Sequence, residues 1–441
     1  MSARIARVRS ASPPGGRVWT SRLGTLADVE ETGATGLARL RAARRARPGL
    51  SSFVGVFGAT FLCFLAIGAV LPVLPRFVKG PVGAGDLAVG VVMGAFALTA
   101  FFGRPLGGRL ADRRGRKFVH LSGLTICVLA GALLFLPLGV PGLILARLVV
   151  GLGDGWVFTA GVTWIVDLAP EDRRGQAIGM FGLAIWGGLT VGSVLGEATR
   201  ALGGYDAVWA FATLTPLLGL LVGSRITPGV AHLDAPAPDR KRAVKAGRRR
   251  LVPRAALRPG VALALSNAGY GTMSAFVVLL LDQRGIGHGA TAFTLFAGSV
   301  VLSRLVAGSL PDRIGPRRCA AGAGMIQAAG LTVLGAAQTW PLAAGGAIVM
   351  GIGTSLVFPS LALMVMDQTE DERRGAAMGG FTSFFDLGFG LGAPFAGLIA
   401  SAGAGEHYTT AFYAGAALCL AGAVIGFVAT RGIGARERAP A

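Results

Sequence analysis

Long apolar stretches separated by short polar ones dominate this 441-residue chain. Each is about 20 residues long, enough for a helix that rises 1.5 Å per residue to cross a hydrocarbon core about 30 Å thick. Alternation of apolar and polar residues, the signature of membrane strands, is absent from them. The pattern therefore predicts an all-α membrane protein with twelve transmembrane helices, near residues 53–75, 87–110, 118–138, 142–166, 175–198, 205–225, 259–281, 290–310, 318–337, 341–366, 375–400 and 408–430.

A repeat relates the two halves of the chain. Residues 108–117 read Gly-Arg-Leu-Ala-Asp-Arg-Arg-Gly-Arg-Lys, and residues 308–318 read Gly-Ser-Leu-Pro-Asp-Arg-Ile-Gly-Pro-Arg-Arg. Asp112 and Asp312 are thus 200 positions apart, and the same offset relates Arg104 to Arg304. A register held over a whole half indicates one module used twice, which in a membrane chain means two pseudo-symmetric six-helix bundles in parallel repeat around a shared path.

The charge follows the topology rather than a nucleic-acid surface. Only 15% of residues are charged, against roughly 25% in soluble proteins, and the net charge of +20 falls mainly between or outside the apolar stretches. The arginine-rich segments come on one side if twelve helices cross, so the positive-inside rule predicts that both termini are cytoplasmic. The bias to Arg, Ala and Gly suggests a bacterial source, which predicts a multi-pass protein of the bacterial cytoplasmic (inner) membrane.

Five segments are expected from this pattern. The segments are a basic cytoplasmic arm (1–50), a first six-helix bundle (51–225), a basic cytoplasmic linker (226–258), a second six-helix bundle (259–430) and a tail (431–441). The arm has no apolar region of the kind that a signal peptide carries. Three interpretations of the arm stay open: a disordered segment, a start codon placed too far upstream, or a basic amphipathic helix on anionic lipid.

Several chemistries find no support in the sequence. The four cysteines lie within apolar stretches and the four histidines at predicted helix ends or loops, so we expect neither disulfides nor a metal site. No phosphate-binding loop of the Gly-x-x-x-x-Gly-Lys-Ser/Thr kind and no nucleophile–base set occurs, so an enzyme and a cofactor are not expected. The expected partners are a small-molecule substrate, protons and the lipid bilayer, with no nucleic acid, and the protein is expected to be a monomer.

The phrase at residues 108–117, between the second and third predicted helices, resembles the signature loop of the major facilitator superfamily, and residues 308–318 resemble a weaker copy. Two further motifs add to the resemblance: residues 68–75, with Pro72 and Pro75, and residues 147–153, with an intramembrane Arg. The resemblance covers about residues 50–430 and is greatest to bacterial drug-efflux or sugar-efflux exporters. One departure concerns the antiporter motif of the fifth helix, where Ser193 stands in place of Pro.

The signature loop itself has a physical interpretation. Asp112 ends the second helix before a tight turn that needs Gly115, and neighbouring cations can hold that turn by ion pairs. In the superfamily the carboxylate faces the N-terminus of the eleventh helix, where the helix dipole favours an anion, and such a contact would latch the two halves. The residues predicted to form this gate are Arg104, Gly108, Asp112, Arg113, Gly115, Arg116, Asp312, Arg313 and Gly315.

Ionisable residues inside the apolar stretches are the sharpest functional candidates, because charge is costly in lipid. Asp154 lies mid-helix with Arg147 seven residues earlier on the same face, so it is predicted to carry the coupling proton or the charge of the substrate; a fixed pair that only packs the helix is the alternative. Asp386 lies at mid-depth in the eleventh helix and is predicted to pair with Arg104 in one access state. The residues predicted to couple transport to protons are Asp154, Arg147 and Asp386. Arg304 is either a gate residue or snorkels to the interface.

Polar and aromatic residues at mid-depth suggest a mostly apolar cavity with few polar handles. The predicted function is therefore a secondary active transporter that exports a small organic molecule by proton antiport through alternating access. An uptake symporter of the same fold is the alternative, and a non-transporting membrane sensor is a third possibility. The residues predicted to bind substrate are Asn267, Tyr270, Trp156, Trp186 and Phe385.

Overall fold

The computed structural model describes residues 48–169, 173–226, 254–369, 374–402 and 407–428. By their contacts the described residues from Gly49 onward belong to one compact unit. The predicted tail and nearly all of the predicted arm and linker lie outside the described residues, so these predictions stay predictions.

Every element of the described chain is a helix, as the apolar pattern predicts. Eleven helical stretches, with α3 and α4 counted as one, are long and apolar enough to cross a membrane. The helices are α3 (Pro48–Val70), α4 (Leu74–Lys79), α5 (Asp86–Arg114), α6 (Arg116–Leu133), α7 (Gly139–Leu168), α8 (Arg174–Ser224), α10 (Arg254–Gln283), α11 (Gly289–Ala307), α12 (Leu310–Ile314), α13 (Pro316–Ala336), α14 (Trp340–Asp367), α15 (Arg374–Ala402) and α16 (His407–Val428).

Eleven stretches stand where the sequence predicts twelve, because the predicted fifth and sixth helices both lie in α8. The backbone of α8 is non-helical at Gly203 and Gly204, and Gly204 has a φ of +70°. Before this point Gly192 packs against the backbone of Ala69 in α3, and after it Gly219 packs against Ala59, earlier in α3. The chain therefore turns back at these two residues, and Gly204 adopts a positive φ that other residues avoid.

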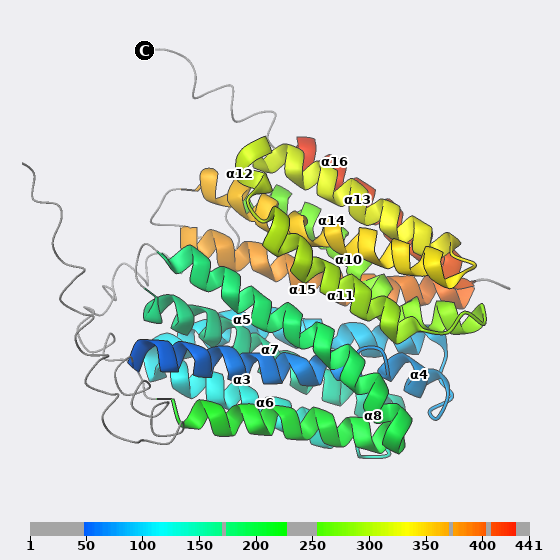
Figure 1. Ribbon diagram of the computed structural model, residues 1–441, viewed down its shortest axis with the longest axis horizontal. Coiled ribbons are helices and arrows are strands. Elements are labelled where there is room, and N and C mark those ends of the chain that lie inside the picture. The colour runs from blue at the N-terminus through cyan, green and yellow to red at the C-terminus, as the bar shows by residue number, and fades with distance from the viewer. Residues whose placement is uncertain (1–47, 170–172, 227–253, 370–373, 403–406, 429–441) are drawn as a thin grey trace, which may run out of the picture. The chain divides into compact units, whose positions relative to one another are not determined.

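The helices form two groups in the chain order (Figure 1). The first group, α3 to α8, lies below the second, α10 to α16, in that view. Equivalent neighbours pack in each group: α5 on α7 and α11 on α14, then α6 on α7 and α13 on α14. Between the groups, α5 packs against α15 and α8 against α11. The repeat also shows in the helix starts, since α6 and α13 begin at Arg116 and Pro316, 200 positions apart.

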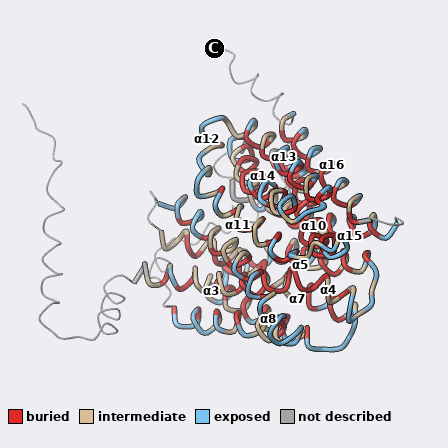
Figure 2. The backbone as a smooth tube through the Cα atoms, turned by 45° about the vertical axis from the view of Figure 1, so that its right-hand side comes forward, coloured by how far each residue is buried: buried red, intermediate tan, exposed pale blue. Residues whose placement is uncertain are grey.

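Burial follows the lines along which the helices face one another (Figure 2). Large apolar side chains are exposed on the outside, and corresponding positions of α5 and α11 do this together, with Phe102 65% exposed and Leu302 62% exposed. An apolar exterior of this kind suits lipid rather than water, where contiguous apolar patches are rare. The exterior thus agrees with a membrane protein.

The two copies of the repeated phrase adopt the same turn. Gly115 has a φ of +89° and Gly315 a φ of +88°, a region that residues with a Cβ avoid. Gly115 separates α5 from α6, and Gly315 separates α12 from α13. The tight turn that the sequence predicts at Gly115 is therefore present, and it recurs at Gly315.

The closest approach between the two groups is made by small residues of α5 and α15. A Cβ on Gly90 would lie 2.3 Å from the carbonyl oxygen of Ala393, and one on Gly94 would lie 2.7 Å from that of Gly390. The glycine run of α8 faces its own group instead: a Cβ on Gly192 would lie 2.3 Å from the carbonyl oxygen of Leu65 in α3. The glycines of α8 thus allow close packing inside the first group, whereas those of α5 allow it between the groups, against α15.

Candidate functional site

A cavity of about 210 Å³ lies between the two groups of helices. Its wall includes Val162 near the end of α7, Ile178 near the start of α8 and Thr382 near the start of α15. These helix ends adjoin the turns at Gly115 and Gly315. We call this end of the protein the signature-loop end. Toward the opposite end the lining reaches Leu71, Phe96 and Arg147, each at least eight residues short of the end of its span. The cavity therefore leans toward the signature-loop end.

One guanidinium joins two buried carboxylates at the wall of this cavity. Arg104 of α5 donates to Asp386 of α15 through Nε at 2.7 Å and Nη2 at 3.0 Å. Its Nη2 also lies 3.4 Å from Oδ2 of Asp154 in α7. The side chains of Asp386 and Asp154 are only 1% and 6% exposed. A bidentate pair of this kind crosses the interface and has both geometric and electrostatic specificity.

Two polar atoms of this cluster have no hydrogen-bond partner within the described residues. They are Oδ1 of Asp154 and Nη1 of Arg104, and both are buried. The aromatic ring of Phe158 covers the guanidinium of Arg104 at 4.4 Å. Asp154 thus keeps one carboxylate oxygen free beside a single cation, which is suited to the exchange of a proton or to contact with a ligand.

Arg147 does not pair with Asp154, contrary to the expectation from their spacing. Its Nη2 donates to the carbonyl oxygen of Met93 at 3.1 Å, and its guanidinium lies 4.8 Å from the centre of the Phe96 ring. Seven residues separate Arg147 from Asp154 by about 10.5 Å along the helix axis, so a shared face does not bring the charges together. The partner of Asp154 is instead Arg104, which belongs to the neighbouring helix α5.

Four of the five predicted substrate residues line the cavity: Asn267, Tyr270, Trp186 and Phe385. The fifth, Trp156, does not, and its indole instead packs against α5, where a Cβ on Gly107 would lie 2.9 Å from Cδ1. Trp156 lies two residues after Asp154, which places it about 200° away around the helix and so on nearly the opposite face; the sequence analysis neglected this rotation.

An aromatic cluster built from four helices forms part of the cavity wall. Tyr270 stacks on Phe296 with centroids 5.4 Å apart, and lies 5.8 Å from Trp186 and 5.0 Å from Phe389. Phe385 lies 6.5 Å from Tyr270 on the same side. Offset and edge-to-face contacts at these distances hold the rings rigidly, so the cavity has a preformed apolar surface.

Two lining residues were undervalued in the sequence. Arg304 of α11 lines the cavity, and the choice between a gate residue and a snorkelling residue stays open. Gln327 of α13 also lines it, donates to the carbonyl oxygen of Ser266 at 2.9 Å, and leaves its Oε1 without a partner in the described chain. Gln327 could have been predicted as a site residue, because it is a lone amide within an apolar stretch.

The end opposite the signature loops is closed by bonds between the groups. Arg76 of α4 makes a bidentate pair with Asp282 of α10 at 2.6 and 2.8 Å. Tyr408 of α16 donates to Asp86 of α5 at 2.7 Å. Arg76 is not among the residues that the sequence predicts for the site, and its partner, 206 positions away, could not be found without the fold.

Apart from Arg104, which lines the cavity, the predicted gate residues lie at the signature-loop end. Asp112, Arg113, Asp312 and Arg313 are exposed, and the described residues offer Asp112 no hydrogen bond or ion pair. Arg116 pairs with Asp167 inside the first group. The other predicted gate glycine, Gly108, has only Thr159 of the same group within 4 Å of an added Cβ. The start of α15 adjoins residues 370–373, which lie outside the described residues, so the predicted latch between Asp112 and this helix stays a prediction.

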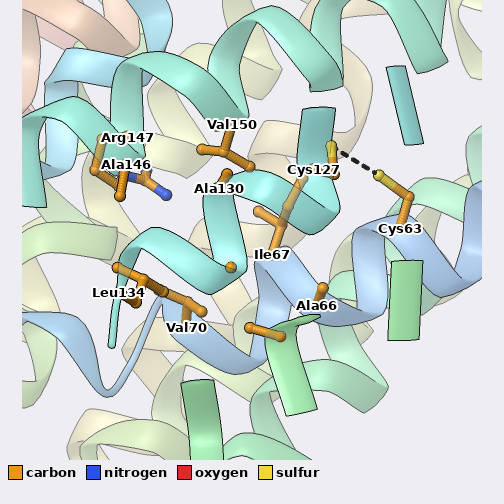
Figure 3. A pocket seen from close by; sticks show the side chains of 12 residues that line it. Cys63, Ala66, Ile67, Val70, Cys127, Ala130, Leu134, Ala146, Arg147 and Val150 are labelled. Atoms are coloured by element: carbon orange, nitrogen blue, oxygen red, sulfur yellow. Dashed lines mark hydrogen bonds between the residues drawn. The ribbon is translucent and has the colours of Figure 1, made fainter. Parts of the chain in front are cut away.

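A second, smaller cavity of about 30 Å³ lies inside the first group (Figure 3). Its wall comes from α3, α6, α7 and α8, and Arg147 lines both cavities. Cys63 and Cys127 meet there with their sulfurs 3.6 Å apart, as free thiols. All four cysteines are buried and free, and no cluster of metal-binding residues occurs in the described ranges.

Comparison with known proteins explains this architecture. The family model of the Major Facilitator Superfamily matches residues 56–298 and 286–440. The chain belongs to this superfamily. It is 31% identical over 380 residues to an uncharacterized MFS-type transporter of Salmonella typhimurium, covering 84% of this chain and 94% of that protein. An uncharacterized MFS-type transporter of Burkholderia mallei is 30% identical over 362 residues, which cover 79% of this chain and 85% of that one.

Solved structures of superfamily transporters share the fold. The nucleoside transporter NupG superposes with a TM-score of 0.70 at 14% identity, over 86% of this chain and 98% of that one. The human organic anion transporter MFSD10 superposes with a TM-score of 0.61 at 19% identity, over 86% and 99%. At these identities the likeness concerns the fold alone. The chain is thus a multi-pass membrane transporter of the superfamily.

The departure from the superfamily's antiporter motif now has a structural consequence. Ser193 of α8, which stands in place of the proline, makes a hydrogen bond of 2.7 Å with Thr294 of α11. Its hydroxyl also donates to the carbonyl oxygen of Thr190 at 2.8 Å. The residue therefore joins the two groups of helices near the closed end, a role that a proline side chain cannot take.

Proposed function

We propose that this protein is a secondary active transporter that exports a small organic molecule by proton antiport through alternating access. The observation that supports the proposal is the cavity between the two groups of helices, where the buried carboxylates of Asp154 and Asp386 both contact the guanidinium of Arg104. An uptake symporter would use the same parts, and the direction of proton movement distinguishes the two.

The architecture behind the proposal is two six-helix bundles. The 51 residues of α8 would extend about 76 Å as one straight helix, far beyond a hydrocarbon core of about 30 Å. The reversal at Gly203 and Gly204 makes two crossings of it and twelve in total. We further propose that a rotation about the membrane normal relates the bundles, that both termini and the signature-loop end face the cytoplasm, and that the protein is a monomer of the bacterial cytoplasmic membrane.

On this topology the structure represents a conformation in which the cavity leans toward the cytoplasm. The pairs Arg76–Asp282 and Asp86–Tyr408 close the outer end between the bundles. Alternating access then requires that these pairs break while the signature-loop end closes. Binding at the shared cavity can drive this exchange only through different contacts in the two states.

Proton coupling is assigned to Asp154 and Asp386. Both carboxylates share one cation, so gain or loss of a proton changes how strongly the groups are held together across α5, α7 and α15. Interactions in this cluster are strong because the surroundings have a low dielectric constant. Arg147 acts indirectly in this scheme, by holding the carbonyl oxygen of Met93 in α5.

The test is proton movement in proteoliposomes that contain a pH-sensitive dye. A solute that enters by antiport expels protons from the lumen and raises luminal pH, whereas symport lowers it. We expect a rise with the wild type, none with Asp154→Asn, and counterflow of the labelled solute partly retained in that variant. Solute-linked proton movement by Asp154→Asn as fast as that of the wild type would refute the assignment of Asp154.

A further inference from the structure

Arg147 and Arg304 are the two cations of the cavity wall that have no acid partner among the described residues, and Arg304 is the less buried of the two. Its Nη2 donates to the carbonyl oxygen of Ser355 at 3.2 Å, and the described residues give it no ion pair. Its guanidinium borders the gap between the groups, because a Cβ on Gly182 of α8 would lie 3.2 Å from Nη1. A half-buried guanidinium with five donors and a single carbonyl acceptor has capacity for an anion.

The repeat shows what is missing around Arg304. Arg104, its equivalent 200 positions earlier, is held by Asp154 and Asp386. The positions equivalent to these two acids in the other copy are Thr354 and Trp186, and both line the cavity. Both are neutral. One copy of the arrangement therefore carries its own counter-anions, and the other has lost them.

The charges of the cavity wall do not balance. Among the described residues of the wall, the ionisable ones other than Tyr270 are three arginines, Arg104, Arg147 and Arg304, and two aspartates, Asp154 and Asp386. With all five charged, the wall has one positive charge in excess. Charge buried in a low-dielectric site is costly unless it is paired, so a single negative charge from a ligand would be strongly favoured there.

The remainder of the wall specifies the body of such a ligand. The rings of Trp186, Tyr270, Phe385 and Phe389 form its aromatic surface, and the amide oxygen of Gln327 is an unused acceptor. Flat apolar groups pack well on rigid aromatic faces. The position of Trp186 connects the two features, since it is both part of this surface and the equivalent of Asp386.

We propose that the cavity binds organic monoanions with an aromatic body, carboxylates above all, and that Arg304 pairs with the anionic group. The proposal rests on the proposed function in one respect, that this cavity is the transport site. It adds the substrate class and a specificity-determining residue. Lipophilic cations and neutral sugars are disfavoured by the excess positive charge.

The experiment measures binding of 2-naphthoate to the full-length protein in lipid nanodiscs by equilibrium dialysis, with 2-naphthamide as the matched neutral compound. We expect the carboxylate to bind about tenfold to a hundredfold more tightly than the amide, the range for hydrogen bonds to a charged group. Arg304→Gln should remove this preference, and Arg304→Lys should keep part of it because a point charge remains.

A second variant tests the missing acid directly. Thr354→Asp supplies a carboxylate at the position equivalent to Asp154, and should abolish binding of 2-naphthoate while binding of 2-naphthamide stays. Thr354→Asn, which has the shape of that Asp without its charge, should still bind the anion more tightly than the amide. Equal binding of anion and amide by the wild type, unchanged in Arg304→Gln, would overturn the proposal, as would preferential binding of tetraphenylphosphonium.

The proteoliposome assay separates this inference from the proposed function. Proton movement driven by a neutral or cationic solute, without binding of 2-naphthoate, contradicts the substrate class and leaves the transporter intact. Binding of 2-naphthoate that depends on Arg304, with neither counterflow nor proton movement by that compound, supports the site and contradicts its role in transport.

Discussion

Arg104 should matter more to stability than either of its acids. Two unit charges about 4 Å apart interact by roughly 4 kcal/mol at the effective dielectric constant of about 20 that reproduces measured protein electrostatics. Arg104→Gln removes its pair with Asp386 and its longer contact with Asp154, and leaves two carboxylates buried together. We expect it to lower the free energy of unfolding by roughly 3–5 kcal/mol, the cost of breaking a buried pair. Asp386→Asn should cost less, because Asp154 still faces the guanidinium.

The four buried thiols make this measurable in detergent, since a thiol-reactive fluorescent dye reports their exposure on heating. The midpoints should fall in the order wild type, Asp386→Asn, Arg104→Gln. The double variant Arg104→Gln/Asp386→Asn should melt above Arg104→Gln alone, because only one unpaired carboxylate then remains. Thr382→Ala, elsewhere on the cavity wall, is the control. Strictly additive effects of the two single changes would refute the reasoning, because they would mean that the residues do not interact.

Two further predictions concern backbone geometry. Gly90→Leu should abolish transport and lower the thermal midpoint by several degrees, because its Cβ would lie 2.3 Å from the carbonyl oxygen of Ala393. The control Gly58→Leu, with no atom within 4 Å of an added Cβ, should change neither transport nor the midpoint. A wild-type midpoint for Gly90→Leu would contradict the close packing of α5 on α15. Gly115→Ala should lower the free energy of unfolding by roughly 1–2 kcal/mol in the same dye assay, because a Cβ is disfavoured at a φ of +89°. Gly85→Ala, at a φ of −75°, should lower it by less, and equal losses would refute the turn argument.

The sequence predicted the elements well because lipid restricts the choices. Runs of about 20 apolar residues must be helices in a bilayer, and the described helices begin and end near the predicted positions. The exception is instructive: two predicted helices appear as α8, because only two glycines separate them. The constant offset of 200 likewise appears in the turns at Gly115 and Gly315, since each copy of the phrase has the same steric requirement.

The site was less accessible from the sequence, because its contacts join distant helices. Equal depth in facing helices was enough to predict Arg104 beside Asp386, since membrane depth is nearly a single coordinate. Depth on one helix was not enough for Asp154, whose partner comes from α5 rather than from Arg147. The bond from Arg76 to Asp282 spans 206 positions and no local pattern indicates it.

Alternating access is the central claim, and the distances across the two ends of the protein test it most directly. In a cysteine-free background, spin labels at Arg113 and Arg313 report the signature-loop end, and labels at Pro81 and Gln338 report the opposite end. Asp282→Asn removes the ionic partner that holds Arg76 across the bundles. The account predicts that this change shortens the first distance and lengthens the second in the same population. Two distances that stay unchanged, or that change in the same direction, would contradict it.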